Sequence, residues 1–264
     1  MSEENKRSIR ISVRNLVEFV LRSGDIDNRR SGNAQKDAML AGGRIHRKIQ
    51  KRMGSGYRAE VPLKHEVTDD EQEIVLSVEG RADGIFTENG ITVIDEIKGM
   101  YTDVARLEAP IEVHLAQAMC YGYFYCCDKD LDGIRLQLTY CNLETEEIRR
   151  FQTDRSKEEL EQWFSGVVHE YFKWARYLYH HELTRDASIR NLEFPYPYRE
   201  GQRDLVVSVY RTISRKKRLF IQAPTGIGKT LSTVFPAVHA IGEGKGDKLF
   251  YLTAKTVTRT VAEE

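Results

Sequence analysis

The sequence predicts an α/β protein in two blocks, a mixed-sheet domain followed by the start of a P-loop domain. Between residues 57 and 99, apolar and polar residues alternate as strands require, and segments with helical spacing flank them. A glycine-rich loop follows a short apolar run near residue 219. Prolines at positions 195 and 197 interrupt regular structure between the blocks, and 264 residues suffice for two domains.

The elements of the first block follow from their hydrophobic periods. Helical spacing dominates its first part, then strands alternate, and a further helix and strand follow. In order, we expect helix over 13–53, strands over 57–67, 73–86 and 91–99, a helix over 110–126 and a strand over 134–143. The Thr-Glu-Asn-Gly stretch at 87–90 predicts a tight hairpin.

A long helix is expected to connect the blocks. Ser156 and Glu159 form a capping box ahead of an apolar stripe with helical spacing. Such a stripe is far more often core than a base-stacking platform. The stripe consists of Leu160, Phe164, Val167, Tyr171, Trp174 and Leu178.

The glycine-rich loop reads Ala223-Pro-Thr-Gly-Ile-Gly-Lys-Thr230, the pattern of a phosphate-binding loop. Gly226 and Gly228 allow backbone N–H groups to turn around a phosphate. Lys229 supplies a positive charge toward the β- and γ-phosphates, and the Thr230 hydroxyl is suited to ligate Mg²⁺. We expect a buried strand over 218–222 before the loop and a helix over 229–244 after it, kinked at Pro236.

Composition limits the classes of function. The chain carries 40 basic and 40 acidic side chains, so a polyanion site must depend on local patches such as residues 44–52 or 215–218, although charge runs are more often plain solvated faces. No apolar run approaches a membrane span and no signal sequence is present, so we expect a cytoplasmic protein without a membrane partner. The four cysteines lack C-x-x-C spacing, which favours free thiols over zinc or disulfides.

A group of charged side chains is predicted on the strands of the first block. On a strand over 91–99, Glu96 and Lys98 share one face while Asp95 points to the other. The hairpin would bring Asp83, at the end of the preceding strand, beside Glu96. Two carboxylates and an ammonium suit a Mg²⁺ site, whereas a lone Glu-x-Lys pair is by default a surface salt bridge.

Residues 30–130 contain "GRADGIF" with Asp83, "VIDEIKG" with Glu96 and Lys98, "HLAQAMCYGYFY" with Gln117 and Tyr121, and "GGRIHRKIQ" with His46. The order and spacing of these motifs give the stretch a resemblance to the PD-(D/E)XK nuclease superfamily in its RecB-like form. This resemblance implies that Asp83, Glu96 and His46 contact Mg²⁺ or Mn²⁺, that Asp83, Glu96 and Lys98 are catalytic, and that Gln117 and Tyr121 face DNA. For His46, a satisfied helix histidine is nearly as good a reading. A β-bulge would put Asp95 in place of Glu96.

In residues 195–264, Arg199 and Gln202 precede the loop Ala223–Thr230, and "KLFYLTAKTVTRTVAEE" follows it. This stretch resembles the opening of a DinG/XPD-type superfamily 2 DNA helicase, whose ATP-binding domain is RecA-like. The resemblance implies that ATP and Mg²⁺ bind at Arg199, Gln202, Ala223, Pro224, Thr225, Gly226, Ile227, Gly228, Lys229 and Thr230. It also implies DNA contacts at Lys255, Thr256 and Arg259. No Asp-Glu-x-His motif follows, so the chain is expected to be a fragment that binds nucleotide without hydrolysing it. An iron–sulfur cluster would belong to the missing downstream region.

The expected activity is that of an ATP-dependent DNA helicase, acting in DNA repair, that couples ATP hydrolysis to movement along single-stranded DNA and carries a metal-dependent nuclease domain. Its partner would be single-stranded or branched DNA. One alternative is a metal-dependent DNA exonuclease or endonuclease, and another is a catalytically silent DNA-binding module. The expected domains are a nuclease-like domain at 1–155, a connecting helix and linker at 156–194, and a truncated RecA-like domain at 195–264.

Overall fold

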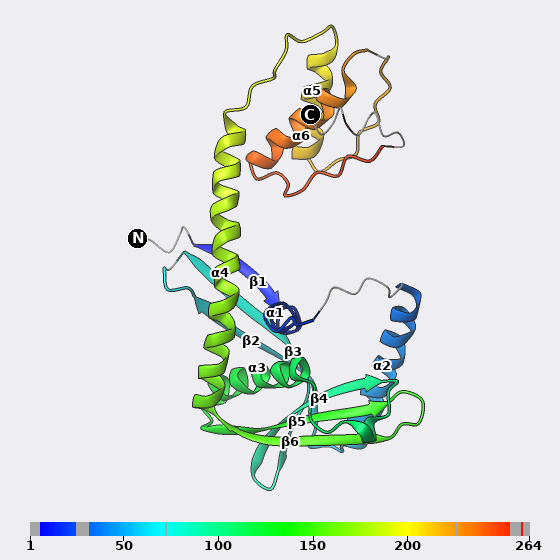
Figure 1. The fold of residues 1–264 in the computed structure, drawn as a ribbon, viewed down its shortest axis with the longest axis vertical. Helices are drawn as coiled ribbons and strands as arrows, with labels where there is room; N and C mark the ends of the chain where they lie inside the picture. Colours follow the sequence, from blue (N-terminus) through cyan, green and yellow to red (C-terminus); the bar gives the residue numbers. More distant parts are fainter. Residues whose placement is uncertain (1–5, 25–31, 72, 225, 254–259, 261–264) are drawn as a thin grey trace. The chain divides into compact units, whose positions relative to one another are not determined.

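The computed structural model describes residues 6–24, 32–71, 73–224, 226–253 and 260, with side chains in the second helix described from residue 40 onward. The chain forms two compact units, Met1–Arg176 and Tyr177–Glu264, and each is described by itself (Figure 1).

The first unit is built on a six-stranded sheet flanked by helices. Its elements in chain order are β1 (Arg7–Ser12), α1 (Val13–Val20), α2 (Gly32–Arg52), β2 (Arg58–Thr68), β3 (Ile74–Glu88), β4 (Ile91–Met100), a short 3₁₀ helix (Val104–Arg106), α3 (Glu112–Lys129), β5 (Gly133–Asn142) and β6 (Ile148–Ser156). Helix α4 (Lys157–Arg190) begins in this unit and continues into the second unit. The α/β class, the three central strands and the strand at 134–143 are confirmed, and β1 and β6 are additional.

The sheet is mixed and forks at β3. The strand order is β1-β3-β4-β5-β6, and β2 pairs with β3 outside this path. β1 with β3 and β4 with β5 are parallel, whereas the remaining pairs are antiparallel. Because β2 occupies one edge of β3 along most of its length, β1 and β4 must share the other edge.

The turn between β3 and β4 is a two-residue hairpin. Asn89 and Gly90 have φ angles of 51° and 80°, the left-handed values that a type I′ turn requires at both central positions. The predicted hairpin is therefore confirmed. It fixes the register in which Gly84 faces Asp95 and Glu88 faces Ile91.

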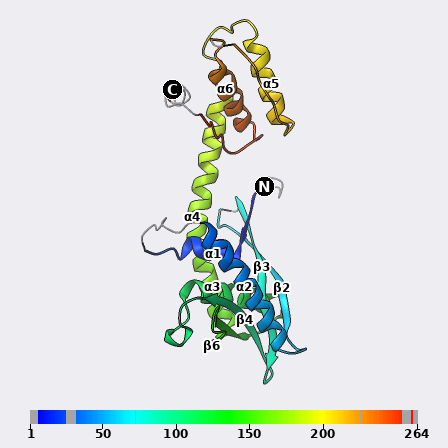
Figure 2. The same ribbon diagram turned by 90° about the vertical axis from the view of Figure 1, so that its right-hand side faces the viewer.

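Helices α2 and α3 lie on opposite faces of β4. Ile45 and Ile49 of α2 are buried in one cluster with Ile97. Lys98, the next residue of β4, points to the other face and reaches Gln117 of α3. Figures 1 and 2 both show α2 close to β4, in agreement with the contacts between the two elements.

Helix α4 begins at the predicted capping box. The Ser156 backbone N–H donates to Glu159 Oε2 at 2.9 Å, and the Glu159 N–H donates to Ser156 Oγ at 3.1 Å. The expectation that the whole apolar stripe is core is wrong, because Leu160 and Phe164 are buried whereas Trp174 and Leu178 are 58% and 56% exposed. Helical periodicity shows which face of a helix is apolar but not how far the packing partner extends.

The second unit contains α5 (Gln202–Ser214) and α6 (Lys229–Gly242). The buried strand predicted over 218–222 is wrong, since no strand forms there and Phe220 is 94% exposed. A strand needs a hydrogen-bonding neighbour, and none of the described residues of this unit forms one. Helix α6 continues through Pro236 and ends two residues before the predicted limit.

Cysteine side chains are free in the structure. Cys120, Cys126 and Cys141 are buried and Cys127 is half-buried, which agrees with the expected reduced thiols. Within the described part of the chain, no helix has the length and apolar character that crossing a membrane requires.

Candidate active site and phosphate-binding loop

The candidate active site lies where β3 and β4 separate. Their pairing runs from Glu88 to Gly84 on β3 and stops there, while β1 pairs with the same edge only as far as Glu79. The edge between these positions is open to other partners. The Asp83 carboxylate fills part of it, because its Oδ2 accepts a 2.7 Å hydrogen bond from the Ile97 backbone N–H. Asp83 therefore lies within β3 and not at its end.

Glu96 and Lys98 form the second part of the site. Lys98 Nζ lies 2.6 Å from Glu96 Oε1 and donates a 2.7 Å hydrogen bond to Gln117 Oε1. Glu96 is 4% exposed, and its Oε2 atom is buried without a hydrogen-bond partner. A buried carboxylate oxygen without a donor is costly, which makes it suited to a cation.

Asp95 points to the opposite face, as the predicted strand register requires. Its Oδ1 atom accepts hydrogen bonds from Thr139 Oγ1 at 2.6 Å and Gln137 Nε2 at 3.1 Å. Its Oδ2 accepts one from Tyr57 Oη at 3.0 Å. No bulge exchanges Asp95 with Glu96, so Glu96 is the carboxylate beside Lys98.

Helix α2 approaches Asp83 with two side chains. His46 Nδ1 lies 3.2 Å from Asp83 Oδ1. Gln50 follows four residues later on the same helix face. Its Nε2 donates a 3.0 Å hydrogen bond to the Asp83 carbonyl and a 3.2 Å hydrogen bond to Glu60 Oε1. Sequence reasoning missed Gln50, although its spacing of one helical turn from His46 was a usable signal.

Glu60 marks an interruption of the β2–β3 ladder beside Asp83. It has a φ of 52°, and the paired register passes from Ala59–Gly84 directly to Val61–Ala82. The Asp83 carbonyl accepts from the Gln50 side chain at this point. Helix α2 is thereby tied to the strand that carries Asp83.

The charges of the site shift the pKa values of its members. Burial raises the pKa of Glu96 to about 7, and the nearby Asp83 carboxylate adds to the rise, while Lys98 opposes it. Burial alone would lower the pKa of His46, but the hydrogen bond and negative charge of Asp83 outweigh it and the pKa is raised. The pKa of Glu96 rises because its carboxylate is buried close to the negative charge of Asp83. The pKa of His46 rises because it lies beside that same charge.

Gln117 and Tyr121 of α3 line the same region. Gln117 is buried and held by Lys98. Burial raises the pKa of the Tyr121 hydroxyl, with Glu96 and Asp83 contributing. A Cβ at Gly80 would lie 2.6 Å from Tyr121 Oη, so glycine at this position leaves room for the hydroxyl over the open edge of β3.

The donor set fits a hard divalent cation held by two carboxylates and water. Asp83 and Glu96 supply oxygen ligands, and Glu96 Oε2 has an unsatisfied lone pair. Among the described residues, His46, Asp83 and Glu96 do not bring three ligand atoms within 4.8 Å of one another. His46 lies against Asp83, and its contact with a metal ion stays a prediction.

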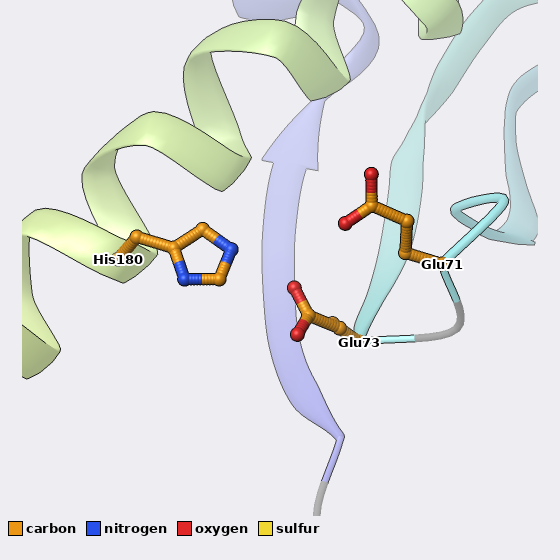
Figure 3. A group of neighbouring side chains, drawn as sticks. All are labelled: Glu71, Glu73 and His180. Atoms are coloured by element: carbon orange, nitrogen blue, oxygen red, sulfur yellow. The ribbon is translucent and has the colours of Figure 1, made fainter.

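Three further side chains with ligand chemistry are labelled in Figure 3, Glu71 and Glu73 near the start of β3 and His180 of α4. Glu71 accepts a hydrogen bond from Arg176. Because Glu71 and Glu73 belong to the first unit and His180 to the second, no metal site is assigned to this trio.

The glycine-rich loop Ala223–Thr230 has its glycines in the left-handed region. Gly226 and Gly228 have φ angles of 89° and 81°, and α6 starts directly after Gly228. Lys229 Nζ donates to the carbonyls of Ala223 at 2.9 Å and Pro224 at 2.8 Å, so the ammonium lies back across the loop.

Arg199 and Gln202 contact the loop. The Arg199 guanidinium donates a hydrogen bond to the Gly226 carbonyl. The backbone N–H of Arg199 donates a 3.0 Å hydrogen bond to Gln202 Oε1. A Cβ at Gly228 would lie 2.6 Å from Gln202 Nε2, so Gly228 is needed for this approach.

The other predicted loop residues are placed as follows. Tyr251 Oη donates 3.3 Å to Thr230 Oγ1, and Ile227 lies near Gly201. The remaining predicted residues, Thr225, Lys255, Thr256 and Arg259, lie outside the described part of the chain.

Comparisons with known proteins relate only a short segment of this chain to another protein. No protein-family model matches the chain. Over 48 residues, it is 44% identical to a protein of Methanocaldococcus jannaschii named as a probable ATP-dependent helicase. This match spans 18% of the present chain and only 7% of that protein's length.

Among solved structures, the crystal structure of SSO0001 aligns with a TM-score of 0.40 and 18% identity, covering 64% of this chain and 77% of that one. Likeness at this level carries no argument about fold or function. The sequence comparison accordingly relates a short part of this α/β chain to an ATP-dependent helicase and goes no further.

Proposed function

We propose that this chain is part of an ATP-dependent DNA helicase of the DinG/XPD type and that its first unit is a metal-dependent DNA nuclease of the PD-(D/E)XK type. One observation carries the nuclease proposal. At the open edge of β3, the buried Glu96 with its unpartnered oxygen is in contact with Lys98, next to the strand that presents Asp83. An ion pair between Glu96 and Lys98 that served only the fold would not require a second carboxylate, Asp83, whose charge raises the pKa of Glu96.

The roles of the side chains follow from their contacts. Asp83 and Glu96 would hold Mg²⁺ or Mn²⁺, which when bound supplies Lewis-acid polarisation of the scissile phosphate and a more acidic water. Lys98, oriented by Gln117, places its ammonium beside Glu96, where it orients the attacking water and offsets negative charge on the phosphate. His46 and Gln50 hold Asp83 in position.

The test of the nuclease is cleavage of labelled single-stranded and branched DNA by the 264-residue chain in Mg²⁺ or Mn²⁺. Products that appear with either metal and disappear in EDTA support it. Complete lack of cleavage in both metals, with DNA binding retained, would favour a silent DNA-binding module.

The metal is expected to compete with a proton at Glu96. Because the pKa of Glu96 is raised to about 7, Mn²⁺ affinity should fall about tenfold for each pH unit below that value and level off above it. Without metal, the stabilisation from this group is present below the ordinary carboxyl pKa and is lost as the pH rises through about 7. Calorimetric titration with Mn²⁺ across this range measures the effect. Glu96→Gln should abolish the pH dependence, and an unchanged profile in that variant would contradict the assignment.

We further propose that the loop Ala223–Thr230 binds ATP or ADP with Mg²⁺. The supporting geometry is the pair of left-handed glycines before α6 and the ammonium of Lys229 at the loop. Backbone N–H groups and the start of α6 would provide the remaining phosphate contacts. Arg199 and Gln202 contact each other and Arg199 contacts the loop, and the resemblance to helicases of this type implies that they bind the adenine base.

Lys229→Ala is expected to weaken ADP binding by about 1.5–3 kcal/mol, the range of a charge-assisted contact. Binding should not vanish, because the loop amides remain. Calorimetric titration with ADP and Mg²⁺ measures the loss. Lys245→Ala is the matched control, since it removes an exposed ammonium just beyond the other end of α6. Equal losses in the two variants would contradict a specific role for Lys229.

A further inference from the structure

Helix α2 presents its charged residues unevenly around its axis. Between Arg44 and Arg52 the sequence carries five cations and no carboxylate, and all five are exposed. At 3.6 residues per turn, Arg47 and Lys51 lie directly beside the face of His46 and Gln50, which contacts Asp83. Lys48 and Arg52 lie on the other flank, next to the buried Ile45 and Ile49.

The two flanks differ in their partners. Lys48 and Arg52 both reach the Glu146 carboxylate at the β5–β6 turn. Within the described residues, Arg47 and Lys51 have no carboxylate partner, nor does Arg44. The cations that flank the candidate active site are thus the ones left available for an external anion.

We propose that Arg47 and Lys51 bind the phosphate backbone of the DNA strand next to the scissile phosphate, so that the substrate runs along α2. This inference rests on the proposed nuclease function and adds the path of its substrate. The two side chains are one helical turn apart, about 6 Å along the axis, on the flank adjoining His46. Phosphate binding by lysine and arginine supplies most of the affinity for nucleic acid and carries no sequence information.

Electrostatics favours an anchor at this place. Asp83 and Glu96 put negative charge at the site, and each contributes to the raised pKa values there. A phosphodiester approaching them is repelled unless cations stand near its path. The chain has no net charge to provide that attraction as a whole, so it must come from local cations, and Arg47 and Lys51 on α2 add to the charge of Lys98.

The test compares two double variants that remove the same charge from the same helix. Arg47→Ala with Lys51→Ala removes the unpaired flank, and Lys48→Ala with Arg52→Ala removes the flank that is paired with Glu146. Binding of fluorescent single-stranded DNA is measured in EDTA over a range of salt concentrations. We expect the first double variant to lose at least about tenfold in affinity and its salt slope to fall by about 1.4, which corresponds to two phosphate contacts. The second should lose much less.

Cleavage kinetics separates this inference from the proposed function. At saturating DNA, the Arg47/Lys51 double variant should keep its maximal rate in Mn²⁺ while its KM rises, because the two residues contact the substrate away from the reacting atoms. Equal effects of the two double variants, or no effect of the first, would overturn the path along α2 and leave the nuclease standing. Failure of the unaltered chain to bind DNA would overturn both.

Discussion

Replacing Lys98 with alanine is expected to lower metal-dependent DNA cleavage by roughly 10²–10⁴-fold, the range for losing a positioned acid–base or charge-stabilising group. The ammonium lies 2.6 Å from Glu96 Oε1 and 2.7 Å from Gln117 Oε1, so alanine removes the positive charge that contacts both side chains. Single-turnover cleavage of single-stranded DNA in Mg²⁺ and Mn²⁺ measures the effect. Asp83→Asn and Glu96→Gln should reduce cleavage comparably, since each removes a proposed metal ligand.

The chain offers a matched control for this variant. Lys64 and Glu66 on β2 form the same kind of ion pair two residues apart, with 2.7 Å between Lys64 Nζ and Glu66 Oε1, but both are exposed and outside the site. Lys64→Ala should leave cleavage unchanged, because exposed ion pairs contribute little. If Lys98→Ala cleaves as well as Lys64→Ala, the cluster at β4 is a structural ion pair and the nuclease proposal falls.

Strand alternation was sufficient to predict the central part of the site. The pattern of residues 91–99 places Glu96 and Lys98 on one face and Asp95 on the other, and the structure has this register. The Asn-Gly turn at 89–90 fixes the pairing of β3 with β4. These features are local, so sequence patterns carry them.

What sequence reasoning missed depends on contacts between distant segments. β1 and β6 are rich in arginine and their side chains are largely half-buried or exposed, so they give only a weak apolar signal. The contact of Gln50 with the Asp83 carbonyl joins α2 to β3 at the position where the β2–β3 pairing skips Glu60 and Asp83. The apolar run 218–222 has strand composition, but without a neighbouring strand its composition does not produce one.

Asp95→Ala is expected to destabilise the first unit by about 3 kcal/mol or more, although Asp95 takes no part in the proposed chemistry. Its carboxylate is fully buried and accepts hydrogen bonds from Tyr57, Gln137 and Thr139. Alanine would leave these buried donors without their acceptor, and each unsatisfied group costs about 1–3 kcal/mol. A Cβ at Gly84 would lie 1.8 Å from the Tyr57 ring, so glycine is required at this position if Tyr57 is to reach Asp95.

Urea unfolding of the unaltered chain and of the Asp95→Ala variant measures the loss of stability. The cleavage rate per folded Asp95→Ala molecule at low temperature should stay within a few-fold of that of the unaltered chain. Asp95→Asn keeps an acceptor oxygen and should be less destabilising than alanine. Burial raises the pKa of Asp95 although three side chains donate hydrogen bonds to it. The free energy of unfolding of the unaltered chain, relative to that of the Asn variant, should therefore fall as the pH rises through the pKa of Asp95 in the folded state. If Asp95→Ala instead retains full stability and loses cleavage as Lys98→Ala does, Asp95 rather than Glu96 faces the reacting phosphate. The register of β4 in solution would then differ by one residue from the one described here.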